Sequence, residues 1–374
     1  MIIKKINIVF PDETRLSGVE IQDGKIIKIG DFNDGYDYSE YYLTPGFIDQ
    51  HIHGCADFDV MDASVEGIKT IARTILKEGT TSFLATTMTM AKKDIIKAIA
   101  VCKNHHDSDS ATILGINLEG PFINESKKGA QAKEHILTPS ISDFNELNQA
   151  RFIEIVTLAP EVYGGYDLVA HLNNQNIVSS IGHSNAMFKE FQKAVDAGAA
   201  QVTHMFNAMS SFTHREIGVV GGALLNNNVT CELICDGIHV SSDAVNLLLK
   251  NKGSDKLILI TDSMRAKHSN QAVSNLGGQT VYVKNGEARL QDGTLAGSVL
   301  PMNKAIKNMI SFTGISVHEA VKMATLNPAK NLKVNHYIGQ IKVGYQADLV
   351  VIDKNFNVIK TIKNGNVVFD KNIV

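Results

Sequence analysis

Apolar runs of strand length alternate with amphipathic, helix-like stretches through the middle of the chain. The runs that predict buried strands cover residues 47–53, 81–88, 112–120, 152–160, 177–184, 200–206, 229–240 and 256–263. Helical spacing of apolar residues follows several of them, as at Ile68, Ile71, Ala72 and Ile75 after the first run. Eight strands separated by helix-length connections over about 250 residues predict an α/β fold, a TIM-like (β/α)8 barrel.

The two ends of the chain show a different pattern, of short strands joined by tight turns. Asp23-Gly24 and Asn364-Gly365 each lie between extended segments, and such dipeptides favour two-residue hairpins. Neither terminal piece is large enough to bury a core of its own. We therefore predict a small discontinuous β-sandwich domain formed by the N- and C-terminal segments, residues 1–45 and 336–374, beside a barrel domain of residues 46–335.

Two local signals refine the end of the barrel. Asn285-Gly286 predicts a further hairpin after the eighth strand. Ser316 and Glu319 have the spacing of a capping box, which predicts the start of a helix. We expect Pro328 to end that helix, because proline lacks the backbone N–H that a helix interior needs.

Composition narrows the functional classes without pointing to a reaction. The chain has 374 residues, 44% of them hydrophobic and 20% charged, which is ordinary for a globular enzyme. A net charge of -3 gives no electrostatic basis for binding nucleic acid or an anionic membrane. The first residues become polar too soon for a signal peptide, and no apolar run is long enough to cross a bilayer. Four cysteines outside any zinc-ribbon spacing predict reduced thiols and a cytoplasmic location.

Polar side chains close five of the predicted strands. In a (β/α)8 barrel the C-terminal ends of the strands build the active site, and His51 and His53, two residues apart, share one face of their strand. The six metal-competent side chains at these ends are His51, His53, Glu119, His183, His204 and Asp262. Each could be structural by itself, as a helix cap, a core histidine or a turn residue, but their joint placement predicts one metal centre.

A metal centre of this kind suits hydrolysis. A bound divalent cation lowers the pKa of its water from ~15.7 toward ~7 and polarises a carbonyl group. Asp262 can take the proton from that water and deliver it to the departing nitrogen. We therefore expect a metal-dependent hydrolase in which Asp262 is the catalytic residue.

Several longer motifs carry a family resemblance that covers nearly the whole chain. They include PGFIDQHIHG (45–54), LEGPFIN (118–124), KKGA (127–130), GHS (182–184), THMFNAM (203–209), FTHRE (212–216), DGIH (236–239), TDSMRA (261–266) and LAGSVLPM (295–302). On these motifs the chain resembles the amidohydrolase superfamily and, within it, the N-acetylglucosamine-6-phosphate deacetylase family. The resemblance implies hydrolysis of the acetyl group from N-acetylglucosamine 6-phosphate, which gives glucosamine 6-phosphate and acetate.

The resemblance also implies how the metal is held. Glu119, His183 and His204 would bind the main ion, and Glu119 would bridge to a second ion. His51, His53 and Asp262 would complete the second site. We expect one or two divalent ions per subunit, of zinc, iron or a similar metal.

Substrate contacts follow from the same resemblance. The implied positions are Ala130, Gln131, Asn207, Ala208, His214, Arg215, His239 and Met302. His239 would hydrogen-bond the acetyl carbonyl or the sugar, although a supporting or core role is an equal alternative. His214 and Arg215 would reach the phosphate from a neighbouring subunit, which implies a homodimer. Arginine suits this role because its planar fork pairs bidentately with phosphate oxygens.

Two departures from the family pattern bear on specificity. Gln131 stands where many relatives have histidine, and a neutral amide replaces a charged imidazole there. Ile217 stands where the familiar motif has proline, which loosens the loop after Arg215.

Three alternatives remain open at this point. The substrate could be the galactosamine isomer, which differs at one hydroxyl. The chain could be another amidohydrolase, such as a dihydroorotase or a deaminase, although many of those use a modified lysine where strand four here ends in Leu158-Ala159-Pro160. A non-catalytic barrel that acts as an assembly partner is the third.

Overall fold

The computed structural model describes residues 1–372, and its centre is an eight-stranded parallel sheet. The strands are β5 (Phe47–Ile52), β8 (Thr80–Thr87), β9 (Thr112–Glu119), β10 (Ile153–Leu158), β11 (Val178–Ile181), β12 (Gln201–Val202), β13 (Thr230–Ile234) and β14 (Leu257–Ile260). They pair in chain order, and a parallel bridge between Ile52 and Ser263 brings the last strand to the first. All eight predicted strands are therefore confirmed, and they form a nearly closed barrel.

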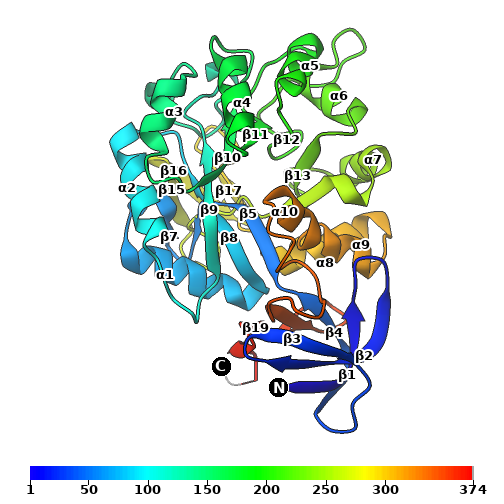
Figure 1. The fold of residues 1–374 in the computed structure, drawn as a ribbon. Helices are drawn as coiled ribbons and strands as arrows, with labels where there is room; N and C mark the ends of the chain where they lie inside the picture. Colours follow the sequence, from blue (N-terminus) through cyan, green and yellow to red (C-terminus); the bar gives the residue numbers. More distant parts are fainter. Residues whose placement is uncertain (373–374) are drawn as a thin grey trace.

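Helices surround this barrel on its outer side (Figure 1). They are α1 (Val65–Thr74), α2 (Lys92–Lys103), α3 (Ile141–Leu147), α4 (Gly165–Asn174), α5 (Phe188–Asp196), α6 (Gly218–Leu225), α7 (Ser242–Lys252) and α8 (Met302–Thr313). Helix α1 illustrates why they form: the Ser64 hydroxyl caps it by accepting from the Gly67 N–H, and Ile68, Ile71 and Ala72 bury one face. No helix within residues 1–372 is long and apolar enough to cross a membrane.

Short elements fill the connections. They are β6 (Gly54–Cys55), β7 (Phe58–Asp59) and the 3₁₀ helices η1 (Val60–Asp62), η2 (Ile75–Glu78), η3 (Glu125–Lys127), η4 (Lys133–His135) and η5 (Ser254–Lys256).

The segment after α8 confirms one prediction and corrects another. The capping box is present, and α9 (Val317–Lys322) begins directly after Ser316. The helix ends at Lys322, however, well before Pro328, so the predicted stop is wrong. Pro328 is the third residue of a separate helix, α10 (Leu326–Asn331). Proline is tolerated there because the N–H groups of a first turn have no partner within the helix.

The N- and C-terminal segments meet in a seven-stranded sheet that lies at one end of the barrel in Figure 1. Its order is β20 (Asn366–Asp370), β19 (Val358–Lys363), β18 (Leu349–Ile352), β4 (Tyr36–Pro45), β1 (Ile2–Val9), β2 (Thr14–Gln22) and β3 (Lys25–Gly30). Strand β18 pairs antiparallel with β4 and so joins the two terminal segments, which share one apolar core. The fold prediction is confirmed, whereas the domain boundaries stay a prediction.

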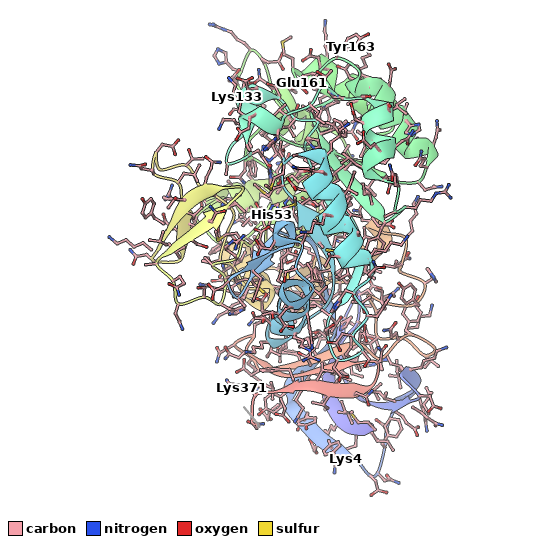
Figure 2. All side chains as sticks on the ribbon, turned by 90° about the vertical axis from the view of Figure 1, so that its left-hand side faces the viewer. Lys4, His53, Lys133, Glu161, Tyr163 and Lys371 are labelled. Carbon is pink, nitrogen blue, oxygen red and sulfur yellow. The ribbon has the colours of Figure 1, made fainter. Side chains whose placement is uncertain are left out.

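The predicted hairpin turns all form. Asp23-Gly24, Asn285-Gly286 and Asn364-Gly365 each have positive φ at both residues, as a two-residue hairpin turn requires. Asn285-Gly286 belongs to a third sheet of β15 (Val273–Leu276), β16 (Gln279–Lys284) and β17 (Glu287–Arg289). This sheet, yellow in Figure 2, stands beside the labelled His53. It therefore lies at one side of the barrel face on which the strands end (Figure 2).

Candidate metal centre and cavity

Six buried donors gather at the C-terminal ends of the barrel strands. Their ligand atoms form two groups, His51 with His53 and Asp262, and Glu119 with His183 and His204. Within each group all ligand atoms lie within 4.8 Å of one another. The joint placement that the sequence predicts is therefore present in space, although the donors come from five different strands.

Glu119 connects the two groups. Its Oε1 lies 3.2 Å from Nε2 of both His183 and His204, and these two nitrogens are 3.1 Å apart. A tetrahedral ion with bonds of about 2.0–2.1 Å needs donors roughly 3.3 Å apart, which fits this group. On the other side, Glu119 Oε2 lies 3.3 Å from His53 Nε2, and Glu119 Oε1 lies 3.4 Å from His51 Nε2. One carboxylate thus faces both groups, as a bridging ligand must.

Three of the histidine rings are oriented by an acceptor oxygen next to Nδ1, on the side of the ring away from the centre. Nδ1 of His51 lies 3.1 Å from Glu232 Oε2, Nδ1 of His183 lies 2.8 Å from the Lys127 carbonyl, and Nδ1 of His53 lies 3.3 Å from the Thr86 carbonyl. Acceptors at these positions place the proton on Nδ1 and leave Nε2 with its lone pair toward the centre. Among residues 1–372, His51 Nε2 has no hydrogen-bond partner although it is fully buried. A buried lone pair without a donor fits a cation ligand.

The histidines of the centre favour the ionised form of its two carboxyl groups. Burial acts against ionisation of Glu119, but the neighbouring rings of His51, His183 and His204 hold the pKa of its carboxyl well below its usual range. Burial also opposes ionisation of Asp262, and His51 and His53 lower its pKa. Both carboxyls are therefore anions, which is the state that binds a divalent cation.

The backbone at the centre is strained. His183, His204 and Asp262 have φ values of 47°, 28° and 47°, in the left-handed region that side chains other than glycine rarely adopt. Each such residue costs of order 1–3 kcal/mol and persists where the surrounding structure over-determines it. Each of the three lies two residues beyond the end of a barrel strand, where this backbone conformation turns the side chain toward the centre.

The centre forms the floor of a cavity of about 320 Å³. The predicted substrate positions Ala130, Gln131, Asn207, Ala208 and His239 line this cavity together with five of the six donors. The sixth donor, His51, lies behind them. The geometry therefore places the candidate metal centre and most of the predicted substrate contacts around one space.

Three predicted positions lie elsewhere. His214 and Arg215 are exposed on the loop before α6, outside the lining described for this cavity. Met302 is a correction: its side chain is fully buried in the barrel core at the first position of α8. Its backbone N–H donates to Glu78, so this residue starts a helix and does not contact the cavity.

The structure also brings in residues that sequence reasoning missed. Asp236 accepts from His239 Nδ1 at 2.7 Å and fixes that ring at the cavity wall. Burial opposes its ionisation, but His239 lowers the pKa of Asp236 below its usual value. Lys127 and Leu276 add further lining, and Leu276 belongs to the β15–β17 sheet. Glu232, which contacts His51 Nδ1, was also missed. The sequence could have pointed to it, because it is the one charged residue in the apolar run VTCELIC.

Gln131 is engaged with the protein on both ends of its amide. Its Nε2 donates to Glu119 Oε2 at 2.5 Å, and its Oε1 accepts from the Thr89 N–H at 2.7 Å. The side chain therefore braces the shared carboxylate at the same time as it lines the cavity.

Comparison with known proteins shows the family to which the chain belongs. A sequence model of the Amidohydrolase family matches residues 42–368. The chain belongs to the amidohydrolase family. The family is metal-dependent, and this amidohydrolase has buried histidine and carboxylate groups that can hold a metal. It is therefore a metal-dependent hydrolase.

Its relatives are similar over nearly their full length. The N-acetylglucosamine-6-phosphate deacetylase of Lysinibacillus sphaericus is 42% identical over 93% of this chain and 92% of its own. That of Bacillus subtilis is 41% identical over 99% and 97%. The crystal structure of the Thermotoga maritima deacetylase of the same name has a TM-score of 0.92 and 37% identity to this amidohydrolase, with coverage of 99% of this chain and 100% of that one.

Proposed function

We propose that this amidohydrolase removes the acetyl group from N-acetylglucosamine 6-phosphate to give glucosamine 6-phosphate and acetate. The observation that carries the proposal is Glu119, which joins two groups of metal donors at the floor of a sugar-sized cavity. Relatives at 41–42% identity with that activity support the choice of substrate.

We infer that Glu119, His183 and His204 hold one divalent ion and that His51, His53 and Asp262 hold a second with Glu119. Zinc, iron or a similar metal suits these nitrogen and oxygen donors. Such an ion supplies a polarised acetyl carbonyl and a water that is acidic enough to give hydroxide at neutral pH.

Asp262 is proposed to carry the proton. Its carboxyl is ionised and lies at the cavity floor, so it can accept the proton of the attacking water. It then delivers that proton to the sugar nitrogen as the C–N bond breaks, because an unprotonated amine is a poor leaving group. His239, fixed by Asp236 through Nδ1, offers Nε2 to the acetyl carbonyl or to the sugar.

The sugar and its phosphate are proposed to be bound from two sides. The backbone near Ala130 and Asn207-Ala208 and the side chain of Gln131 line the cavity and would contact the sugar. His214 and Arg215 are exposed and are therefore free to contact another subunit. We propose that in a homodimer they bind the phosphate of the substrate held in the neighbouring subunit. We also propose a cytoplasmic location, since the four cysteines are all free thiols.

Release of acetate by metal-replete protein tests this function. We expect turnover of N-acetylglucosamine 6-phosphate that a chelator abolishes and added metal restores. Protein that holds metal but releases no acetate would refute the proposal and favour a non-catalytic barrel. Elemental analysis of the same sample should give two metal equivalents per chain, and at most one would refute the second site.

A second substrate deserves a parallel assay. The N-acetylgalactosamine-6-phosphate deacetylase of Escherichia coli O157:H7 is 35% identical over 84% of this chain and 85% of its own. We expect kcat/KM to favour the glucosamine isomer, because the more similar relatives act on it. A higher kcat/KM for the galactosamine isomer would reverse this assignment.

A further inference from the structure

Glu232 is a fully buried carboxylate inside the barrel, on β13. Its Oε2 lies 3.1 Å from His51 Nδ1 and 3.3 Å from the backbone N–H of His204. Its Oε1 accepts from the side-chain amides of Gln50 at 2.7 Å and Gln201 at 2.9 Å. Both oxygens therefore face donors, which is the environment of a carboxylate and makes His51 Nδ1 the donor in its contact.

A polar network holds Glu232 in place from below. Gln50 also donates to Gln201 Oε1 at 2.9 Å, and Gln201 donates to Ser180 Oγ at 3.1 Å. Asn331 of α10 donates to the carbonyl oxygens of both Gln50 and Gln201, at 3.0 and 2.7 Å. Since Gln50 and Gln201 are hydrogen-bonded to each other and both to Asn331, the carboxylate that they hold has little freedom to turn away from His51.

We propose that Glu232 is a positioning residue that holds His51 as its Nδ1–H tautomer and aims His51 Nε2 at the second ion. The proposal deepens the two-ion function and rests on it. His51 and His53 both lie against the two carboxylates of the centre, and His51 Nε2 is 3.4 Å from Glu119 and 3.5 Å from Asp262. Nδ1 of His53 and Nδ1 of His183 contact neutral backbone carbonyls, whereas Nδ1 of His51 contacts a carboxylate. A carboxylate behind an imidazole raises its basicity as a ligand.

Glu232→Gln provides the direct test. Glutamine keeps the shape of the side chain, but it replaces one acceptor oxygen with an NH₂ group. That group must face other donors, either His51 Nδ1–H and the His204 N–H or the amides of Gln50 and Gln201. Equilibrium dialysis of Zn²⁺ with elemental analysis then measures both equivalents. We expect the second equivalent to bind about 10- to 100-fold more weakly and the first to bind as in the wild type. Wild-type affinity for both equivalents would overturn the proposal.

Asn331→Ala is the matched control. Asn331 belongs to the same network but contacts neither Glu232 nor His51. We expect this variant to lose much less affinity for the second equivalent than Glu232→Gln, because Gln50 and Gln201 still donate to Glu232. If it weakens the second equivalent as much as Glu232→Gln does, the effect reflects a general disturbance of the barrel interior, and the positioning role is refuted.

The tautomer can be measured on the Zn²⁺-loaded wild type, so the test survives a variant that fails to fold. Long-range ¹H–¹⁵N spectra distinguish the two neutral forms of histidine, and His51→Gln identifies the signal. We expect His51 to carry its proton on Nδ1, and a proton on Nε2 would overturn the proposal. This result is independent of acetate release, so failure of the positioning role and failure of the proposed function are told apart.

Discussion

Asp262 combines two duties in one side chain, because it belongs to a donor group and is proposed to move the proton. Its left-handed backbone and its contacts with His51 and His53 hold the carboxyl at the cavity floor. His51 and His53 outweigh the effect of burial and lower the pKa of this carboxyl, so it is deprotonated at neutral pH and has a free site for a proton.

Asp262→Asn should therefore lower kcat strongly. General acid–base catalysis contributes about 10²- to 10⁴-fold, and an amide can neither accept nor deliver the proton. Acetate release measures the loss, while metal analysis checks that the Glu119, His183 and His204 group still holds its ion. Activity within a few-fold of wild type would remove the proton-transfer role.

The cysteine thiols should be inert in the folded protein. Burial raises the pKa of Cys55 and Cys102 to about 12, and it raises that of Cys231 to about 11. Cys235 is also buried and its pKa is raised. Because the thiolate is the reactive form, we expect no alkylation at neutral pH in native protein and four modified cysteines in denaturant. Mass spectrometry reads this out, and rapid modification of native Cys55 would contradict it.

At the scale of elements, a buried ion pair ties three segments together. Glu78 at the end of η2 lies 2.9 Å from Lys267 Nζ and 2.6 Å from His268 Nε2, in the loop after β14. It also accepts from the Met302 N–H at the start of α8. His268 therefore has a structural contact. This cluster holds the loop that follows Asp262 against the barrel.

Lys267→Met should destabilise the protein by about 3–5 kcal/mol, because it leaves the buried Glu78 carboxylate without its main partner. Urea unfolding measures the change. Arg73→Met is the control, since Arg73 and Asp107 form a 2.9 Å pair in which Arg73 is half exposed. We expect about 1 kcal/mol or less there. Equal losses for the two variants would contradict the assigned strength of the buried pair.

The same cluster predicts a pH dependence of stability. Burial raises the pKa of Glu78, but Lys267 and His268 outweigh it and hold the pKa below the usual 4.5. A folded-state pKa below the unfolded value gives stability that is present above about pH 4.5 and is lost as pH falls through the folded pKa. Glu78→Gln should therefore show a flatter stability profile below pH 4.5. An unchanged slope would contradict the lowered pKa.

At the scale of the whole molecule, barrel closure assembles the centre. The His51 carbonyl accepts from the Asp262 N–H at 2.8 Å, so the first and last strands meet at the donors themselves. The β15–β17 sheet closes the cavity from the side, where Gln279 donates to the Ala130 carbonyl at 2.6 Å. The role proposed for the exposed Arg215 requires a second subunit.

Arg215→Ala should raise KM for the phosphorylated sugar by about 10- to 100-fold, the value of a charged hydrogen bond of about 1.5–3 kcal/mol. The KM for N-acetylglucosamine should not change. Lys133→Ala, which removes another exposed cation, is the control. Equal effects on both sugars would refute the phosphate role.

The proposed dimer has its own test. If Arg215 acts on the neighbouring subunit, mixing the Arg215→Ala and Asp262→Asn proteins should restore activity, because one hybrid site then has both residues. Mixed protein whose kcat/KM for the phosphorylated sugar is no higher than the mean of the two parents would contradict the shared site.

The sequence by itself determined the eight strands, the three hairpin turns and the six donors at strand ends. Hydrophobic period and turn chemistry act over a few residues, so they can be read locally. The donors could be predicted because every parallel barrel strand ends on the same face.

Tertiary structure alone decided the rest. The pairing of Glu232 with His51, the left-handed backbone at His204 and the burial of Met302 depend on segments far apart in the chain. Local pattern carries no information on which distant side chain satisfies a buried polar atom, and the need to satisfy it selects the partner only once the barrel has closed.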